Sequence, residues 1–126
     1  GNIKNVRFRK ITCLGESGVL IHGTENNPIK DISFENLQVT LSKTSKWNCG
    51  IYDLRPAIDV GITESRNSCI FIKNAENITI EKASAKFGAV CDSYAHGLYA
   101  ENVKNLQLIR FDAESAAEEE DNIKII

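Results

Sequence analysis

The stretch SCIFIKNAENITIEKAS, residues 68–84, decides the fold of this chain because two other stretches repeat its pattern. Residues 17–39 read SGVLIHGTENNPIKDISFENLQV, and residues 96–113 read HGLYAENVKNLQLIRFDA. In each stretch, apolar and polar residues alternate over short runs that Asn, Gly or Pro interrupt, which is the period of a half-buried strand. Internal repeats of this kind indicate stacked structural units, so we expect equivalent residues to lie next to one another.

The repeats align on a polar turn residue that recurs at intervals of 26, 46 and 28 positions. The turn residues are Asn5, Asp31, Asn77 and Asn105. The residues that follow them predict one inward apolar column, made of Val6, Ile32, Ile78 and Leu106. An earlier strand in each unit predicts a second column, made of Val19, Ile70 and Leu98. Stacked side-chain amides bond one another and the turn backbone, so we expect the turn residues to form a polar ladder.

These patterns predict an all-β fold, a single-stranded right-handed parallel β-helix of about four coils that forms one domain over residues 1–126. Helices are disfavoured because the segments are rich in Ile, Val, Phe and Thr and are broken every few residues. A leucine-rich repeat shares the asparagine but has a shorter unit and a stricter leucine pattern. Equivalent residues of successive coils are then expected roughly 4.8 Å apart.

The 46-residue interval holds one coil plus an insertion, which we place at about residues 42–67. The insertion contains Trp47, the only tryptophan of the chain, together with Tyr52, Asp53 and Arg55. Long loops on a rigid scaffold commonly carry binding groups. The alternative is that Trp47 and Tyr52 pack the loop onto the body, because a buried aromatic side chain anchors a long loop.

Composition excludes several classes of function. The 126 residues carry a net charge of −2 and contain no long basic run, so no nucleic-acid partner is expected. The apolar runs are too short to cross a membrane, and no membrane partner is expected either. No metal site or cofactor is expected, because the four cysteines contain no CxxC pair. They fit best as small core fillers, and their disulfide state stays open; they are Cys13, Cys49, Cys69 and Cys91.

Four segments resemble family 28 glycoside hydrolases, the polygalacturonase-like branch of the pectin-active β-helix proteins. They are GVLIHGTENNPIKDISFENLQV, SKWNCGIYDLRPA, FIKNAENITIEKA and AHGLYAENVKNLQL. The resemblance covers nearly the whole chain. More narrowly, the chain is similar to the C-terminal coils of bacterial members of this family. It implies a pectin lyase-like solenoid, an extracellular or periplasmic location, and a polysaccharide substrate that contains uronic acids.

The resemblance also implies a cleft along one sheet, to which GVLIHG, CIFIKN and GLYAEN correspond. Its outward positions would form two surface columns, Leu20/Phe71/Tyr99 and His22/Lys73/Glu101. An aromatic column beside a charged one suits a polyuronate, whose sugar faces are apolar and whose carboxylates are anionic. Lys73 would be the carboxylate partner, assisted by protonated His22. The residues expected to contact sugar are His22, Lys73, Tyr99, Glu101, Trp47 and Arg55.

The catalytic motifs of the family are absent from this chain. Inverting glycosidases need a carboxylic acid and a carboxylate base, which the family takes from an Asn-Thr-Asp motif and an Asp-Asp pair. Asn67-Ser68-Cys69 stands where the Asp-Asp pair is sought, and Ala95 replaces the first glycine of a Gly-His-Gly motif. No catalytic residue is therefore assigned. The family's Arg-Ile-Lys substrate clamp also has no clean counterpart.

Other candidate groups have simpler structural explanations. Asp53 and Asp59 flank Arg55 and are a conceivable acid/base pair, although an Asp53–Arg55 ion pair that shapes the loop fits better. His96 precedes a glycine at a strand start, so a turn role competes with a role as base or sugar contact. For Glu101, a cross-coil pair with Lys73 is the simpler interpretation.

The chain is interpreted as the C-terminal part of a polygalacturonase-like glycoside hydrolase, in which it extends the sugar cleft and caps the helix. The catalytic carboxylates would then lie upstream of the chain. The alternatives are a non-catalytic carbohydrate-binding or adhesin-like module, and a pure scaffold. Because the first coil starts without a cap, we expect self-association or an upstream β-helix to cover it.

Overall fold

The computed structural model of the protein describes residues 1–57 and 60–126, and every regular element in those ranges is a β-strand. The strands are β1 (Lys4–Gly15), β2 (Val19–His22), β3 (Ile29–Leu41), β4 (Ile51–Ala57), β5 (Val60–Glu64), β6 (Ile70–Phe87), β7 (Leu98–Ala113) and β8 (Ile123–Ile125). Six of them form one sheet, in which β1, β3, β6, β7 and β8 follow one another and β2 pairs with β6. All pairs in this sheet are parallel, so the prediction of an all-β chain with stacked parallel strands is confirmed.

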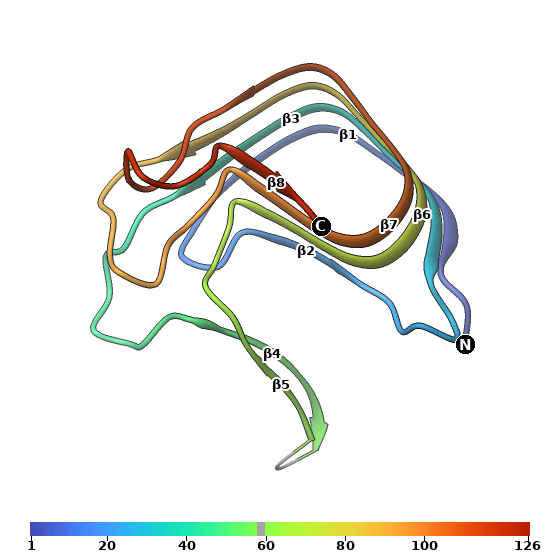
Figure 1. The fold of residues 1–126 in the computed structure, drawn as a ribbon, viewed down its shortest axis with the longest axis horizontal. Helices are drawn as coiled ribbons and strands as arrows, with labels where there is room; N and C mark the ends of the chain where they lie inside the picture. Colours follow the sequence, from blue (N-terminus) through green and yellow to red (C-terminus); the bar gives the residue numbers. More distant parts are fainter. Residues whose placement is uncertain (58–59) are drawn as a thin grey trace.

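The register of the sheet matches the two predicted apolar columns. Val19 pairs with Ile70, Ile70 pairs with Leu98, and β8 adds Ile123 below Leu98. The second column pairs in the same way, through Val6, Ile32, Ile78 and Leu106. Residues 26, 46 or 28 positions apart are thus neighbours in space, and the long strands follow one another around the same bends (Figure 1).

The bends fall at residues with left-handed backbone. Among the residues that the structure describes, every non-glycine residue with positive φ lies in one of the four long strands, with φ between 53° and 61°. One bend carries the predicted ladder of Asn5, Asp31, Asn77 and Asn105. Asn77 Nδ2 donates to Asp31 Oδ1 at 2.9 Å, and Asn105 Nδ2 donates to Asn77 Oδ1 at 2.9 Å, which confirms the ladder. Asparagine tolerates this conformation better than most residues, so Asn77 and Asn105 both adopt the bend at the ladder and link it to the neighbouring strand.

The core fills the space that the bent strands enclose. Side chains of β3 and of the second half of β6, from Ile78 on, alternate between buried and more exposed, as expected for strands with one inward face. The most deeply buried aliphatic side chains are Leu37, Val39, Leu41, Ile70, Ile72, Ile78, Ile80 and Leu98. Each such side chain stabilises the fold by about 1.5–3 kcal/mol through burial alone.

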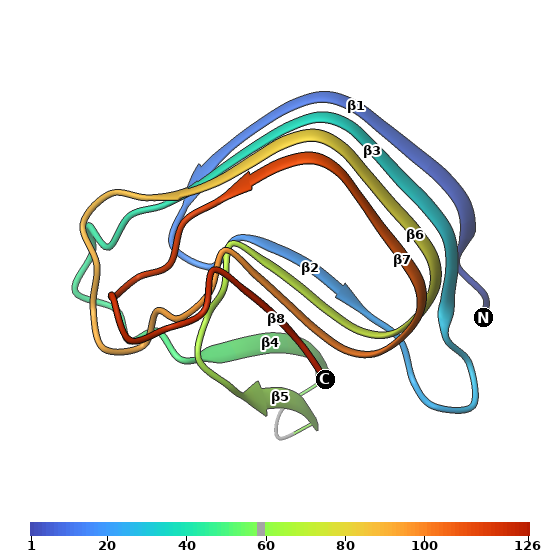
Figure 2. The same cartoon turned by 45° about the horizontal axis from the view of Figure 1, so that its top comes forward.

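The insertion forms an antiparallel hairpin rather than an irregular loop. β4 pairs with β5 through Ile51–Glu64, Tyr52–Thr63 and Asp53–Ile62, and the two strands make a separate sheet. The hairpin projects away from the stacked strands on the side where β2 lies (Figures 1 and 2). The alternation of residues in β4 and β5 explains the pairing, because Tyr52 turns toward the body while its neighbours Ile51 and Asp53 are exposed.

The outer strands of the main sheet leave apolar side chains exposed. On the β1 side these are Ile3 (57% exposed), Phe8 (38%) and Leu14 (77%). On the opposite side Ile109, Ile125 and Ile126 are exposed to 41%, 61% and 67%. Phe8 still stacks on Phe34, with ring centroids 4.9 Å apart, but within the described residues β1 has no neighbouring strand on its other side.

Candidate functional site

The outward face of β2, β6 and β7 brings together four of the predicted sugar-binding residues. Leu20, Phe71 and Tyr99 are consecutive partners in the register, and so are His22, Lys73 and Glu101. The rings of Phe71 and Tyr99 stack at 5.0 Å with an angle of 18°. The two columns therefore exist as predicted, one aromatic and one charged, side by side along the stack.

The hairpin covers the middle of the aromatic column. Tyr52 of β4 lies against Phe71, with ring centroids 4.6 Å apart, and both side chains are only 3% exposed. The Tyr52 hydroxyl accepts a hydrogen bond from the backbone N–H of Ser68 at 3.1 Å, and burial raises the pKa of Tyr52. The prediction that Phe71 lies on a free surface is wrong, because the hairpin docks on it. Leu20 and Tyr99 remain partly exposed on either side.

The charged column is internally neutralised. Lys73 Nζ lies 2.8 Å from Glu101 Oε2, and the Tyr99 hydroxyl donates to Glu101 Oε1 at 2.6 Å. The Lys73 ammonium, helped by the Tyr99 hydroxyl, lowers the pKa of Glu101. Burial and the Glu101 carboxylate raise the pKa of Tyr99 to about 12. Glu101 is consequently ionised at neutral pH, and a uronate that approached Lys73 would compete with it.

A groove of about 320 Å³ runs between β2 and the start of the hairpin. It is lined by Ser17, Gly18, Leu20, Asn48, Cys49, Ile51, Tyr52 and Asp53. Leu20 and Ile51 supply apolar lining, and Asn48, Ser17 and Asp53 supply an amide, a hydroxyl and a carboxylate group. This mixture fits a ligand with apolar ring faces and many hydroxyls.

Asp53 is held by Arg55 at the rim of this groove. Arg55 Nε donates to Asp53 Oδ1 at 2.8 Å, Nη2 donates to Oδ2 at 2.6 Å, and the Arg55 backbone N–H donates to Oδ1 at 3.1 Å. The guanidinium lowers the pKa of Asp53, so this carboxyl is a poor general acid. Asp59, the other member of the conceivable acid/base pair, lies outside the described residues.

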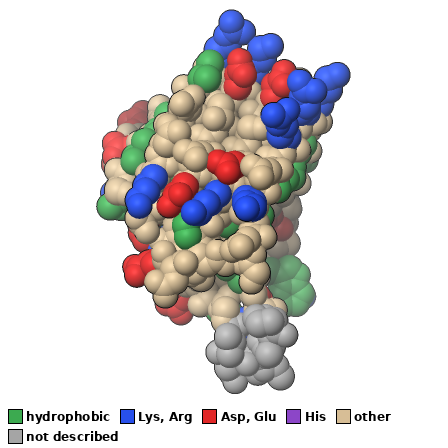
Figure 3. Space-filling view, turned by 90° about the vertical axis from the view of Figure 1, so that its right-hand side faces the viewer, with side chains coloured by type: hydrophobic (Ala, Val, Ile, Leu, Met, Phe, Trp, Pro, Cys, Tyr) green, Lys and Arg blue, Asp and Glu red, His purple; other side chains and the backbone are tan. Residues whose placement is uncertain are grey.

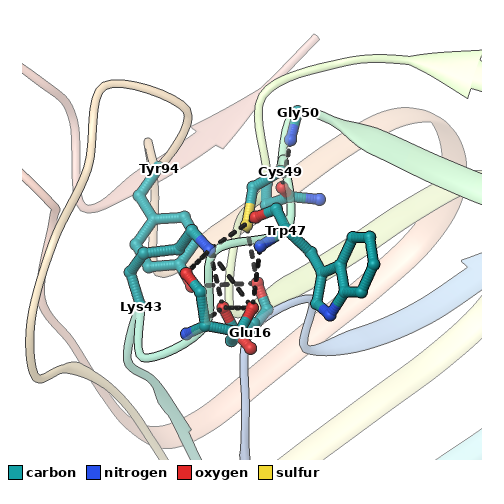
Figure 4. Close-up of polar contacts among 8 residues, drawn as sticks. Glu16, Lys43, Trp47, Cys49, Gly50 and Tyr94 are labelled. Atoms are coloured by element: carbon teal, nitrogen blue, oxygen red, sulfur yellow. Dashed lines mark hydrogen bonds and ion pairs between the residues drawn. The ribbon is translucent and has the colours of Figure 1, made fainter.

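A polar cluster at the base of the insertion was not predicted from the sequence (Figure 4). Lys43 Nζ donates to Glu16 Oε1 at 2.9 Å and to the backbone oxygens of Ser45 and Trp47, both at 2.5 Å. Ser45 donates to Glu16 through its hydroxyl at 3.0 Å and its N–H at 3.2 Å. These donors, Lys43 first, lower the pKa of Glu16 to about 2. Glu16 and Lys43 are 27 positions apart, so opposite charges separated by one coil length were the available signal.

Trp47 and Tyr52 behave in opposite ways. Trp47 is 73% exposed, although its backbone N–H donates to Ser45 Oγ at 3.2 Å and its carbonyl accepts from Lys43. Lys46 Nζ lies 5.3 Å from the centre of the indole ring. Of the two aromatic residues, only Tyr52 packs the insertion onto the body. Trp47 immediately precedes Asn48 and Cys49, which line the groove, and its ring is open to solvent.

His96 has a structural role rather than a place in the groove. Its ring Nδ1 lies 2.6 Å from the carbonyl oxygen of Asp121, and its backbone N–H donates to Ser68 Oγ at 3.3 Å. Its side chain is 9% exposed, and Nε2 lies 4.0 Å from Glu120 Oε2. These contacts tie the start of β7 to the turn that precedes β8, so the turn interpretation of His96 is supported.

The four cysteines are free thiols, with Cys69 fully buried in the core. Burial raises the pKa of Cys69 to about 12 and also raises that of Cys49. Among residues 1–57 and 60–126, no group of three or more His, Cys, Asp or Glu side chains could hold a metal ion. The same ranges contain no helix with the length and hydropathy to span a bilayer.

Comparisons of the chain with protein-family models, with curated proteins and with solved structures find no match. The resemblance to family 28 glycoside hydrolases is therefore a hypothesis that rests only on the sequence segments quoted above. The chemistry available at the site is that of paired charges, one free indole ring and a polar groove.

Proposed function

We propose that this chain is a right-handed parallel β-helix of the polygalacturonase-like class, whose face beside the β4–β5 hairpin binds a polysaccharide. The winding is supported by the regular vertical partners at 26, 46 and 28 positions and by bends at equivalent residues in each strand. In this proposal the protein acts outside the cell or in the periplasm, where such polysaccharides occur.

The exposure of Trp47 is the observation that carries the proposal. A 73% exposed tryptophan costs solvation free energy unless a ligand covers it, and here the backbone on both sides of it is held by Lys43 and Ser45. Pre-organised aromatic rings bind flat apolar surfaces with little loss of conformational entropy, and the faces of sugar rings are such surfaces. The groove that follows Trp47 would receive the next sugar units of the same chain.

The paired carboxylates favour binding without cleavage by these coils. An inverting glycosidase needs one protonated carboxylic acid and one base roughly 6.5–9.5 Å apart. Glu101 is tied to Lys73 and Asp53 is tied to Arg55, and the pKa of each carboxyl is lowered. In the proposed enzyme, the catalytic carboxylates therefore lie outside residues 1–126, and this segment extends the cleft.

The pairing of Glu101 with Lys73 and of Asp53 with Arg55 also favours a second candidate, a non-catalytic carbohydrate-binding or adhesin-like module. The two candidates differ only in whether catalytic coils belong to the same protein. A parent protein that hydrolyses polygalacturonate would support the first candidate. A parent that binds the polymer without shortening it would support the second.

Binding to polygalacturonate and to a neutral β-glucan tests the site directly. We expect Trp47→Ala to weaken binding of at least one polymer about tenfold, an energy of about 1.4 kcal/mol. Leu54→Ala is the matched control, because Leu54 is a 44% exposed apolar residue of the same insertion and lies outside the groove lining. Equal binding by the wild type and Trp47→Ala would contradict the proposal, as would hydrolysis that Asp53→Asn abolishes.

We also propose that another coil covers the exposed strand β1, either from a second copy or from an adjoining β-helix. One face of the Phe8 ring stacks on Phe34, and the other face has no neighbouring strand among those that the structure describes. The outer edge of β1 also has unpaired backbone groups. Sedimentation of the chain at increasing concentration distinguishes the two sources. Reversible association supports a second copy, and a monomer at all concentrations leaves the adjoining β-helix.

A further inference from the structure

The second bend of the long strands differs in chemistry from the other bends. Its left-handed residues are Lys10, Asn36, Lys82 and Arg110, with φ of 56°, 61°, 55° and 54°. Their neighbours Ile11, Leu37, Ala83 and Phe111 are consecutive partners in the register, so the four bend residues form one column along the stack. We call this column the basic ridge. The ladder bend, by comparison, carries only Asn and Asp at its left-handed positions.

The fold alone does not account for cations on the basic ridge. A left-handed backbone is costly for residues with long side chains, whereas Asn and Gly adopt it more easily. Asn36 shows that this bend accepts asparagine. Lys10, Lys82 and Arg110 are exposed, and none of them forms an ion pair within the described ranges. Backbone strain kept at exposed positions without an ion pair points to a function of those side chains.

A hollow of about 480 Å³ lies beside the basic ridge, lined by Arg9, Lys10, Glu35, Asn36 and Lys82. Glu35 Oε2 accepts from Arg9 Nε at 3.0 Å, so this carboxylate balances Arg9 and leaves Lys10 and Lys82 free. Figure 3 shows lysine and arginine side chains at one end of the molecule and in a second row across the middle of the view, with acidic side chains in both places. Neighbouring coils are roughly 4.8 Å apart, so Lys82 and Arg110 stand one step apart and Lys10 stands two steps from Lys82.

We propose that the basic ridge binds an anionic polysaccharide that runs along the stack. A linear polymer with one carboxylate or sulfate on successive sugars meets successive cations of the column. Its hydroxyl groups also meet the acceptors Glu35 and Asn36, which line the same hollow. A single-stranded nucleic acid also needs a surface on which its bases stack, and the residues that line this hollow include no aromatic ring.

This proposal is independent of the groove at the hairpin, because the two surfaces share no residue. The test therefore uses the full chain with Trp47→Ala, which removes the exposed indole of the groove. Binding of this chain to polygalacturonate and to dextran sulfate is measured at increasing salt, with neutral dextran as the blank. We expect binding of at least one anionic polymer, and we expect it to weaken as salt screens the cations.

The deciding variant adds Lys10→Asn, Lys82→Asn and Arg110→Asn, which place at each position the residue that Asn36 shows to fit. Affinity should fall roughly tenfold or more, while the melting temperature stays level or rises because backbone strain is relieved. The matched control adds Lys4→Gln, Lys86→Gln and Lys104→Gln, which remove the same charge from other exposed positions. The control should keep its affinity within about twofold, since long-range charge contributes little at moderate salt.

Three results would overturn the proposal. The first is a lack of binding to both anionic polymers by the Trp47→Ala chain. The second is an equal loss of affinity in the asparagine variant and the glutamine control, which would indicate a net-charge effect. The third is equally tight binding of single-stranded DNA or of vesicles containing anionic lipid, which would make the ridge a general polyanion surface. The proposal that the groove binds polysaccharide is tested separately, by comparing Trp47→Ala with the wild type. Its failure would not change the result expected for the asparagine variant.

Discussion

The stacked strands and the inserted hairpin are held together in different ways. In the stack, an inward residue such as Ile78 has a partner on each side, Ile32 and Leu106, and Ile32 in turn lies between Val6 and Ile78. The hairpin rests on a few single contacts, chiefly Tyr52 on Phe71 and the cluster around Glu16. The difference teaches that the stack is stabilised by many equivalent contacts, whereas the hairpin depends on individual side chains.

The largest expected effect on stability comes from truncating one buried side chain of an apolar column. Ile78→Ala should lower the free energy of unfolding by about 2–5 kcal/mol, because Ile78 is fully buried between two neighbouring strands and its truncation leaves a cavity. Urea unfolding followed by circular dichroism measures the loss. Ile109→Ala, a change at a 41% exposed position on β7, is the control and should cost less than about 1 kcal/mol. Similar losses in both variants would contradict the picture of a shared core.

A smaller and local effect is expected when the hairpin loses its anchor. Tyr52→Ala should cost about 2 kcal/mol, from the lost burial and the lost ring contact with Phe71. Hydrogen exchange should rise over residues 51–57 and 60–64 and change little in β3, because β3 does not depend on the hairpin. Tyr52→Phe retains the ring and tests the hydrogen bond from Ser68 separately. Faster exchange throughout the main sheet would show that the two regions unfold as one.

The most subtle difference between the regions is their response to acid. The pKa of Glu16 is about 2 in the folded protein and 4.5 in the unfolded chain, so its contribution is complete above about pH 4.5. That contribution is lost as the pH falls from 4.5 toward 2. We expect Glu16→Gln to be less stable than the wild type at pH 7 and nearly equal to it at pH 2, by urea midpoint. A stability difference that does not change with pH would show that the Glu16 charge contributes nothing.

The stack could be predicted from sequence because its information is periodic. Alternation within strands, together with recurring Asn and Asp at the bends, places Val19, Ile70 and Leu98 in one column, as observed. The charge pair of Lys73 and Glu101 follows from the same register. Each of these contacts follows from a pattern that several paired strands share, so the sequence of one strand helps to predict the contacts of the next.

The hairpin could not be predicted to the same depth because its contacts occur once. Nothing in the pattern distinguishes Trp47, which is exposed, from Tyr52, which is buried on Phe71. The direction in which a hairpin leaves the body depends on three-dimensional packing at its base. The cluster of Glu16 and Lys43 sets that base, and these two residues stand out only after the coil length is known.

One interval in the stack has a consequence for how this chain can change length. Ile70 to Leu98 and Asn77 to Asn105 both span 28 positions, so residues 70–97 begin and end at equivalent points of successive coils. Such a segment is a module in the genetic sense. Its tandem duplication would add one more set of paired strands with the same cross-section, including an Asn at the ladder and a cation on the basic ridge. Gain or loss of whole modules therefore offers this protein a way to adjust the length of its surfaces without redesigning any bend.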